Sequence, residues 1–157
     1  MDHMQIHFGF SYLGLLFLLM MIIPNIIWTK QKPLNYDSYE KKENKVLGFL
    51  EKIGQVLVTC ISLLFNNFQS SWIPVLLLAC LCMLLYEVYW IRYFLGPKTM
   101  KAFYCSLFGI PVPGASLPVF AFLLLGIYGF NIPLIVATII LGIGHIGIHL
   151  AHRKETK

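Results

Sequence analysis

The sequence predicts an all-α membrane protein, a polytopic bundle of about five transmembrane helices that forms one integral membrane domain over residues 1–157. Residues 8–28 carry no charged side chain, and a run of that length matches the roughly 20 residues that a helix needs to cross the bilayer hydrocarbon. Similar runs recur almost to the C-terminus. The whole chain is 58% hydrophobic and only 12% charged, whereas about a quarter of the residues in a soluble domain are charged. These apolar surfaces therefore indicate lipid-facing and interhelical contacts rather than a soluble core.

Hydropathy divides the chain into membrane segments that are separated by polar or proline-containing connections. The expected segments cover about 7–28, 46–66, 72–95, 116–130 and 132–152. The fourth segment is short, so four crossings is the alternative count. Residues 102–112 are apolar but too few to span about 30 Å of hydrocarbon, and they are expected to form an interfacial or re-entrant piece.

Local signals refine the first two segments. Pro24 is expected to kink the first helix or to end it early. The connection 29–45 is polar and contains Asp37 followed three residues later by Glu40, which resembles a capping box. We expect a helix to begin at Asp37 and to continue through the second segment to about Asn66.

The distribution of Lys and Arg predicts the orientation of the chain. Basic residues lie in the connection 29–45, around residues 92–101 and in the C-terminal tail, whereas the connections at 66–71 and 129–131 carry none. Because Lys and Arg concentrate on cytoplasmic connections, this alternation predicts an N-terminus outside and a C-terminus in the cytoplasm. We expect an integral protein of the plasma membrane.

Polar residues inside the membrane segments gather in the half that this orientation assigns to the cytoplasm, with depth estimated at about 1.5 Å per residue from each helix end. They are Asn25, Glu51, Gln55, Glu87, Arg92, His145 and His149. The other half holds only small hydroxyl side chains, which can bond to their own helix backbone. The sequence therefore predicts a polar site in the cytoplasmic half, with Asn25, Glu51 and Gln55 as candidate ligand-binding residues.

Glu87 is a candidate general acid or base. A carboxylate at this depth costs roughly 2.5 to 3.5 kcal/mol to insert and is a functional hypothesis by default. The alternative is a structural ion pair with Arg92, Lys52 or Arg153. Arg92 lies five residues along, roughly 140° around the helix, so a partner on another helix is favoured.

The histidines of the last segment form a second candidate site. His145, His149 and His152 share one face of a helix. His145 and His149 could hold a divalent metal together with Glu87 or Glu51 as an oxygen ligand. The metalloprotease motif His-Glu-x-x-His is absent. The alternative is that His149 and His152 lie at headgroup level while His145 bonds to a neighbouring helix.

Other cofactors and partners are constrained by position. A haem held by two histidines of one chain is not expected, because His3 and His7 belong to the opposite side of the membrane. The net charge of +5 comes from Lys and Arg beside segment ends, where they contact anionic headgroups of membrane lipids, so nucleic-acid binding is not expected. The sequence leaves open whether the protein forms a homo-oligomer and whether it binds a lipid-like or hydrophobic small molecule.

Three glycines flank the histidines, namely Gly142, Gly144 and Gly147. Small residues let transmembrane helices approach closely, so close packing is one interpretation. The other is that they leave room for a ligand against the histidine face.

Two functions remain from different classes. The favoured one is a noncatalytic binding or accessory membrane protein, in which the polar residues form a buried network. The alternative is a small intramembrane enzyme that acts on a lipid or other hydrophobic substrate, with Glu87 and His145 as catalytic groups and Arg92 holding an anionic headgroup. The sequence identifies no family.

Overall fold

The computed structural model describes residues 8–66 and 72–156, and the regular elements in these ranges are helices. They are α1 (Tyr12–Thr29), α2 (Tyr36–Glu40), α3 (Lys45–Leu64), α4 (Ile73–Leu95), α5 (Met100–Phe103), α6 (Pro113–Tyr128) and α7 (Ile132–Glu155). Four of them, α1, α3, α4 and α7, are long and apolar enough to cross a membrane. The shorter apolar helix α6 has 16 residues, about 24 Å at 1.5 Å per residue. The predicted helical membrane bundle is confirmed.

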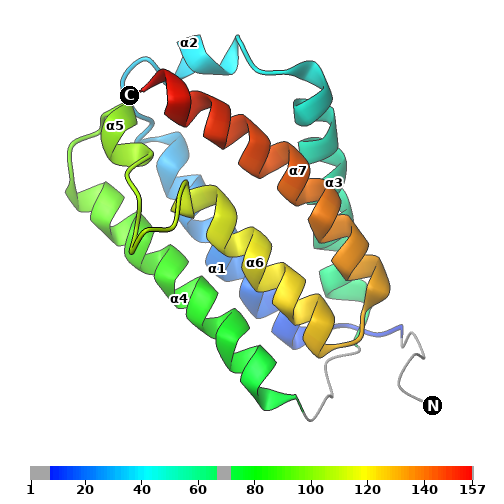
Figure 1. Ribbon diagram of the computed structural model, residues 1–157. Coiled ribbons are helices and arrows are strands. Elements are labelled where there is room, and N and C mark those ends of the chain that lie inside the picture. Colours follow the sequence, from blue (N-terminus) through cyan, green and yellow to red (C-terminus); the bar gives the residue numbers. More distant parts are fainter. Residues whose placement is uncertain (1–7, 67–71, 157) are drawn as a thin grey trace.

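The helices run alternately up and down, and α6 and α7 form a hairpin between α4 and α3 (Figure 1). Helix α4 packs on α6, and α3 packs on α7. Helix α1 contacts both α3 and α4 and so closes the back of the bundle. The α1–α3 connection, the α4–α6 connection and the end of α7 all lie at one end of the molecule. We call it the basic end, because it holds Lys30, Lys32, Lys41, Lys42, Lys45, Lys98, Lys101, Arg153 and Lys154.

An aromatic cluster around Phe103 of α5 holds the basic end together. The ring of Phe103 lies 5.8 Å from that of Trp28 on α1, and 6.1 and 5.2 Å from those of Trp90 and Tyr93 on α4. Tyr36 of α2 adds an edge contact at 6.1 Å. Buried aromatic pairs contribute about 0.5 to 1.5 kcal/mol each beyond the area they bury, so this cluster fixes α1 against α4 and α5.

The continuous helix expected from Asp37 to about Asn66 is wrong. Helix α2 ends at Glu40, and α3 begins at Lys45 with Asn44 as its N-cap. The Asn44 side chain accepts hydrogen bonds from the backbone N–H groups of the next turn, at 2.8 and 3.3 Å. Asp37 is also not a cap, since it lies inside the first turn of α2. The charged residues between the two helices have no apolar face to bury, and a good N-cap starts the second helix afresh.

Helix α1 does not end at Pro24 but continues to Thr29, so the early end is wrong. The amide of Asn25 donates to the carbonyl oxygen of Met21 at 2.7 Å and to the hydroxyl of Tyr86 on α4 at 2.9 Å. Tyr86 donates to the same Met21 carbonyl at 3.3 Å. Side chains of this kind satisfy backbone groups that a proline disturbs in a membrane helix.

Residues 104–112 form a loop rather than a spanning helix, as expected for the apolar stretch 102–112. Leu107 and Ile110 exchange backbone hydrogen bonds of 3.3 and 2.9 Å. Val112 then begins α6 with a φ of 42°. The loop is too short and too irregular to cross the bilayer by itself.

Candidate functional site

The close contact between α3 and α7 builds the site. A Cβ atom on Gly144 would collide with the backbone nitrogen of Glu51 and would lie 2.6 Å from the carbonyl oxygen of Leu47. A Cβ atom on Gly54 would lie 2.5 Å from the Cα atom of Leu141. Because only hydrogen atoms fit at these two crossings, the backbones of α3 and α7 approach closely. This confirms the close-packing interpretation for Gly144, and it presses Glu51 against the histidine face.

Glu51, His145 and His149 converge at this contact. The Nδ1 atom of His145 lies 2.5 Å from Oε1 of Glu51, and the two side chains are 21% and 19% exposed. His149 lies one turn further along α7, and its ring centroid is 4.5 Å from that of His145. One ligand atom from each of the three residues lies within 4.8 Å of the other two. Two helices therefore present three metal-binding side chains to one point.

The Glu51–His145 hydrogen bond determines what the imidazole can do. If the neutral ring carries its proton on Nδ1, it donates to the carboxylate and leaves the lone pair of Nε2 free. Carboxylates orient metal-binding histidines in this way and raise their basicity. The pair can thus serve a bound cation or pass a proton.

His152 continues the row towards the basic end but is buried, with 3% of its surface exposed. The hydroxyl of Tyr104 lies 2.9 Å from its Nδ1, and Oε1 of Glu43 lies 3.4 Å from its Nε2. The sequence did not predict this burial, and the position of His152 at headgroup level stays a prediction. Tyr104 and Glu43 come from connections far away in the sequence, and no spacing pattern could have placed them here.

Near His152, at the end of the histidine row next to the basic end, the surroundings favour the protonated forms of Glu43 and Tyr104. Burial raises the pKa of Glu43, and the negative charges of Glu51 and Glu40 raise it further, whereas His145 and Lys52 oppose the shift. Burial also raises the pKa of Tyr104 well above its ordinary value. Tyr104 therefore keeps its proton near neutral pH and can donate it to His152.

The structure does not bring Glu87 to the histidines. Glu87 lies on α4, whose main packing partners are α6 and α1, about 100° around the helix from the buried Tyr86. Its Oε1 atom is buried and has no hydrogen-bond partner among residues 8–66 and 72–156. The sequence ranked Glu87 by depth alone, which fixes no direction around the helix. Glu51 is the carboxylate that the geometry supplies.

Arg92 bonds to the loop between α5 and α6. Its guanidinium donates to the carbonyl oxygens of Ser106 and Cys105 at 2.9 and 2.8 Å. Arg153 donates to the Ser106 hydroxyl at 2.8 Å. Both arginines thus fasten the loop between α5 and α6 to the longer helices. Backbone carbonyls thus engage the Arg92 guanidinium, and its role in holding an anionic headgroup stays a prediction.

The two amides expected to bind a ligand take different positions. The amide nitrogen of Gln55 lies 3.4 Å from Oε1 of Glu51, so Gln55 borders the site. Asn25 is bonded to Tyr86, as described above, and both amide side chains belong to exposed residues. His3 and His7, the two histidines expected on the opposite side of the membrane, lie outside the described residues.

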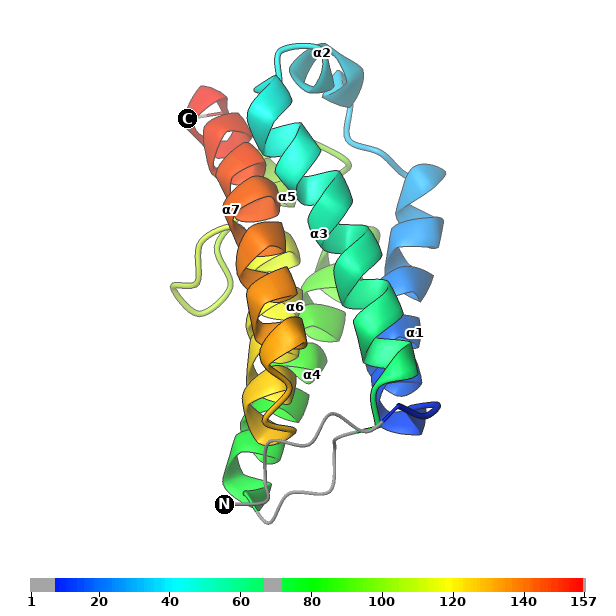
Figure 2. The same cartoon turned by 90° about the vertical axis from the view of Figure 1, so that its right-hand side faces the viewer.

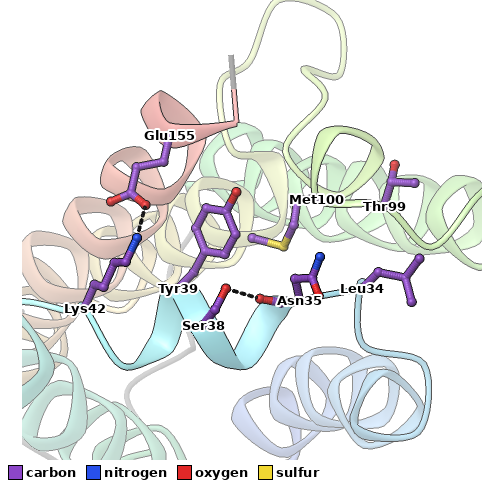
Figure 3. A pocket seen from close by; sticks show the side chains of 8 residues that line it. All are labelled: Leu34, Asn35, Ser38, Tyr39, Lys42, Thr99, Met100 and Glu155. Atoms are coloured by element: carbon purple, nitrogen blue, oxygen red, sulfur yellow. Dashed lines mark hydrogen bonds and ion pairs between the residues drawn. The ribbon is translucent and has the colours of Figure 1, made fainter.

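A separate pocket of about 570 Å³ lies at the surface of the basic end (Figure 3). Its lining comes from α2, the start of α5 and the end of α7, and comprises Leu34, Asn35, Ser38, Tyr39, Lys42, Thr99, Met100 and Glu155. The ring of Tyr39 also packs 5.8 Å from that of His152, so Tyr39 separates this pocket from the histidine row. Lys42 and Glu155 pair at 3.8 Å across one edge, which balances the charge there.

No family model, curated protein or solved structure matches this chain. The geometry of the site itself is therefore the basis for a function.

Proposed function

We propose that this protein is an integral membrane protein that binds a divalent metal ion, of the zinc class, through Glu51, His145 and His149. The observation that carries the proposal is the convergence of these three side chains from α3 and α7. Two imidazole nitrogens and one carboxylate oxygen form a ligand set that zinc uses in proteins. Binding without catalysis is the role favoured first.

The distances support this assignment. Ligand atoms about 2.0 to 2.2 Å from one tetrahedral zinc ion lie roughly 3.4 Å apart. The three ligand atoms already lie within 4.8 Å of one another, so small side-chain rotations bring them to one ion. The ion would replace the proton between Glu51 and His145, so that Glu51 would bind the ion directly instead of orienting the His145 ring. The amide of Gln55 would then hold the carboxylate in place.

In this proposal the basic end faces the cytoplasm, and the bundle lies in the plasma membrane. The support is the gathering of the basic connections and the C-terminal tail at one end, which follows the positive-inside rule. Anionic lipid headgroups on that side would attract the exposed lysines. The metal site then belongs to the cytoplasmic half of the membrane.

A second candidate is a small intramembrane enzyme that uses the same metal to act on a lipid or another hydrophobic substrate. The observation in its favour is that, among residues 8–66 and 72–156, the cluster offers three protein ligands rather than four. Catalytic zinc sites keep one position open for water or substrate, whereas structural sites are closed by four ligands.

Metal content of the purified protein tests the proposal. The wild-type protein in detergent should retain about one zinc ion per chain after dialysis, and Glu51→Gln, His145→Ala and His149→Ala should each weaken zinc binding by roughly 10- to 100-fold or more. Glu87→Gln is the matched control, since it removes another intramembrane carboxylate and should leave zinc binding unchanged. Zinc loss in Glu87→Gln but not in Glu51→Gln, or no zinc binding by the wild-type protein, would overturn the proposal.

A further inference from the structure

Helices α1 and α3 meet at the end opposite the basic end and separate towards it (Figure 2). At the meeting point the backbone N–H groups of Gly9 and Ser11 donate to the carbonyl oxygens of Leu64 and Leu63 at 3.0 and 2.9 Å. A Cβ atom on Gly14 would collide with the carbonyl group of Ser62. The two helices therefore touch backbone to backbone there.

Towards the basic end each helix has a different partner. Helix α1 is held by α4 and α5, because Trp28 stacks on Phe103 and the hydroxyl of Tyr93 donates to the carbonyl oxygen of Gln31 at 2.7 Å. Helix α3 is held by α7, through the glycine contacts of Gly54 and Gly144. Because α1 and α3 pack on different helices at this end, they diverge from each other.

The inner face of α3 becomes exposed along this separation. Gln55 and Ser62 are seven residues apart and therefore only about 20° apart around the helix. Ser62 is fully buried at 0%, whereas Gln55 is exposed. Glu51 and Val58 repeat the pattern one turn away, with 19% of the Glu51 side chain exposed and Val58 at 1%.

The inner face of α1 shows the same change. Asn25 lies within about 20° of both Gly14 and Leu18 around the helix, and these two residues are buried while Asn25 is exposed. His145 on α7 likewise shares its face with the buried Leu134, about 20° away. Inward-facing polar groups that are buried at one level and exposed at another indicate an opening between α1 and α3 beside the proposed metal site.

The chemistry of the opening indicates its occupant. Exposed aliphatic side chains flank it on the outer surfaces, including Ile22 and Ile26 on α1 and Val56 on α3. The exposed Lys52 lies one turn before Val56. The Gln55 amide offers a hydrogen-bond donor, whereas the Asn25 amide already donates to Met21 and Tyr86. A divalent ion at the histidines would add positive charge. An aliphatic border beside the exposed Lys52 and the Gln55 amide fits an acyl chain with an anionic headgroup.

We propose that an anionic lipid with a phosphate headgroup enters sideways between α1 and α3, with its headgroup at Gln55 and the metal and its acyl chain against the aliphatic border. The role of the metal in holding the headgroup rests on the proposed function, whereas the opening itself does not. Entry is from the leaflet next to the basic end.

Photo-crosslinking with a diazirine-labelled phosphatidic acid in phosphatidylcholine vesicles tests this inference on the full-length protein. Gln55→Trp fills the opening and should lower crosslinking to α1 and α3 roughly tenfold or more. Cys60→Trp is the matched control, because Cys60 is exposed on the same helix but about 140° away from Gln55; it should leave crosslinking unchanged. Unlabelled phosphatidic acid should compete, and inorganic phosphate should not.

Zinc content is measured on the same samples, so that the two proposals fail separately. One outcome is that the wild-type protein contains no zinc but crosslinks to the lipid, and that Gln55→Trp lowers this crosslinking. That outcome would overturn the metal site and support the opening. Competition by inorganic phosphate would identify a free anion rather than a lipid and would overturn the inference. Equal crosslinking in Gln55→Trp and Cys60→Trp would overturn it as well.

Discussion

Glu51 and Glu87 are two carboxylates in the same half of one helical bundle, and their surroundings differ. Glu51 lies in the contact of α3 with α7, where it bonds to His145 at 2.5 Å. Glu87 lies at the margin of the buried face of α4, where its Oε1 atom finds no hydrogen-bond partner within the described ranges. Depth in the membrane is shared by both residues. The difference comes from the neighbouring helix, because α7 brings His145 and His149 to Glu51.

The largest effect that we expect comes from the contact that positions Glu51. Gly144→Ala places a methyl group against the backbone of α3, where nothing can yield except the helix itself. Overpacking of this kind costs about 1 to 3 kcal/mol and sometimes more. Thermal unfolding in detergent should show this loss, and zinc binding should fall with it.

Gly48→Ala is the matched control for that variant. A Cβ atom on Gly48 of α3 meets nothing within 4 Å, and alanine is the better helix former by up to about 1 kcal/mol. The control should therefore unfold at the same temperature as the wild-type protein or above it. Equal losses in both variants would mean that α3 and α7 do not pack at Gly144.

The two carboxylates should respond in opposite ways to amide substitution. Glu51→Gln replaces a charge-assisted hydrogen bond to His145 with a neutral one, and the expected loss is about 1 to 2 kcal/mol in the free energy of unfolding. Glu87→Gln removes a charge that has no partner in the described structure, so stability should be unchanged or higher. Unfolding of the two variants side by side, without added metal, measures this difference. A larger loss in Glu87→Gln would point to a structural ion pair at Glu87.

Hydropathy was sufficient for the helical bundle, because a helix of membrane-spanning length is a local property of the chain. It was not sufficient for the break between α2 and α3. There a single N-cap, Asn44, outweighs the capping pattern at Asp37 and Glu40. Pro24 was misjudged for a related reason, since α1 is held past the proline by Tyr86 of a different helix.

The sequence predicted the residue types of the candidate site, two histidines and a carboxylate, but not which carboxylate joins the histidines. The spacing of His145 and His149 required only one helix, and the structure keeps them together. The choice between Glu51 and Glu87 depended on which helix lies against α7. That choice follows from Gly54 and Gly144, two glycines on different helices whose pairing no single segment reveals. Glu43 and Tyr104 lie in connections, where periodicity carries no information.

The smallest effect that we expect is a pH dependence of stability that comes from Glu43, which lies beside His152. Burial and the charges of Glu51 and Glu40 raise the pKa of Glu43 in the folded protein. The folded state therefore binds this proton more tightly than the unfolded chain, whose Glu pKa is about 4.3. The contribution of Glu43 to stability is then fully present below that value and is lost as the pH rises through the raised pKa. Glu43→Gln cannot titrate, so wild-type unfolding temperatures should fall relative to this variant as the pH rises from the unfolded-chain pKa through the raised pKa of Glu43. The opposite slope would mean that a charged Glu43 is favoured, as in an ion pair with protonated His152 at their 3.4 Å separation.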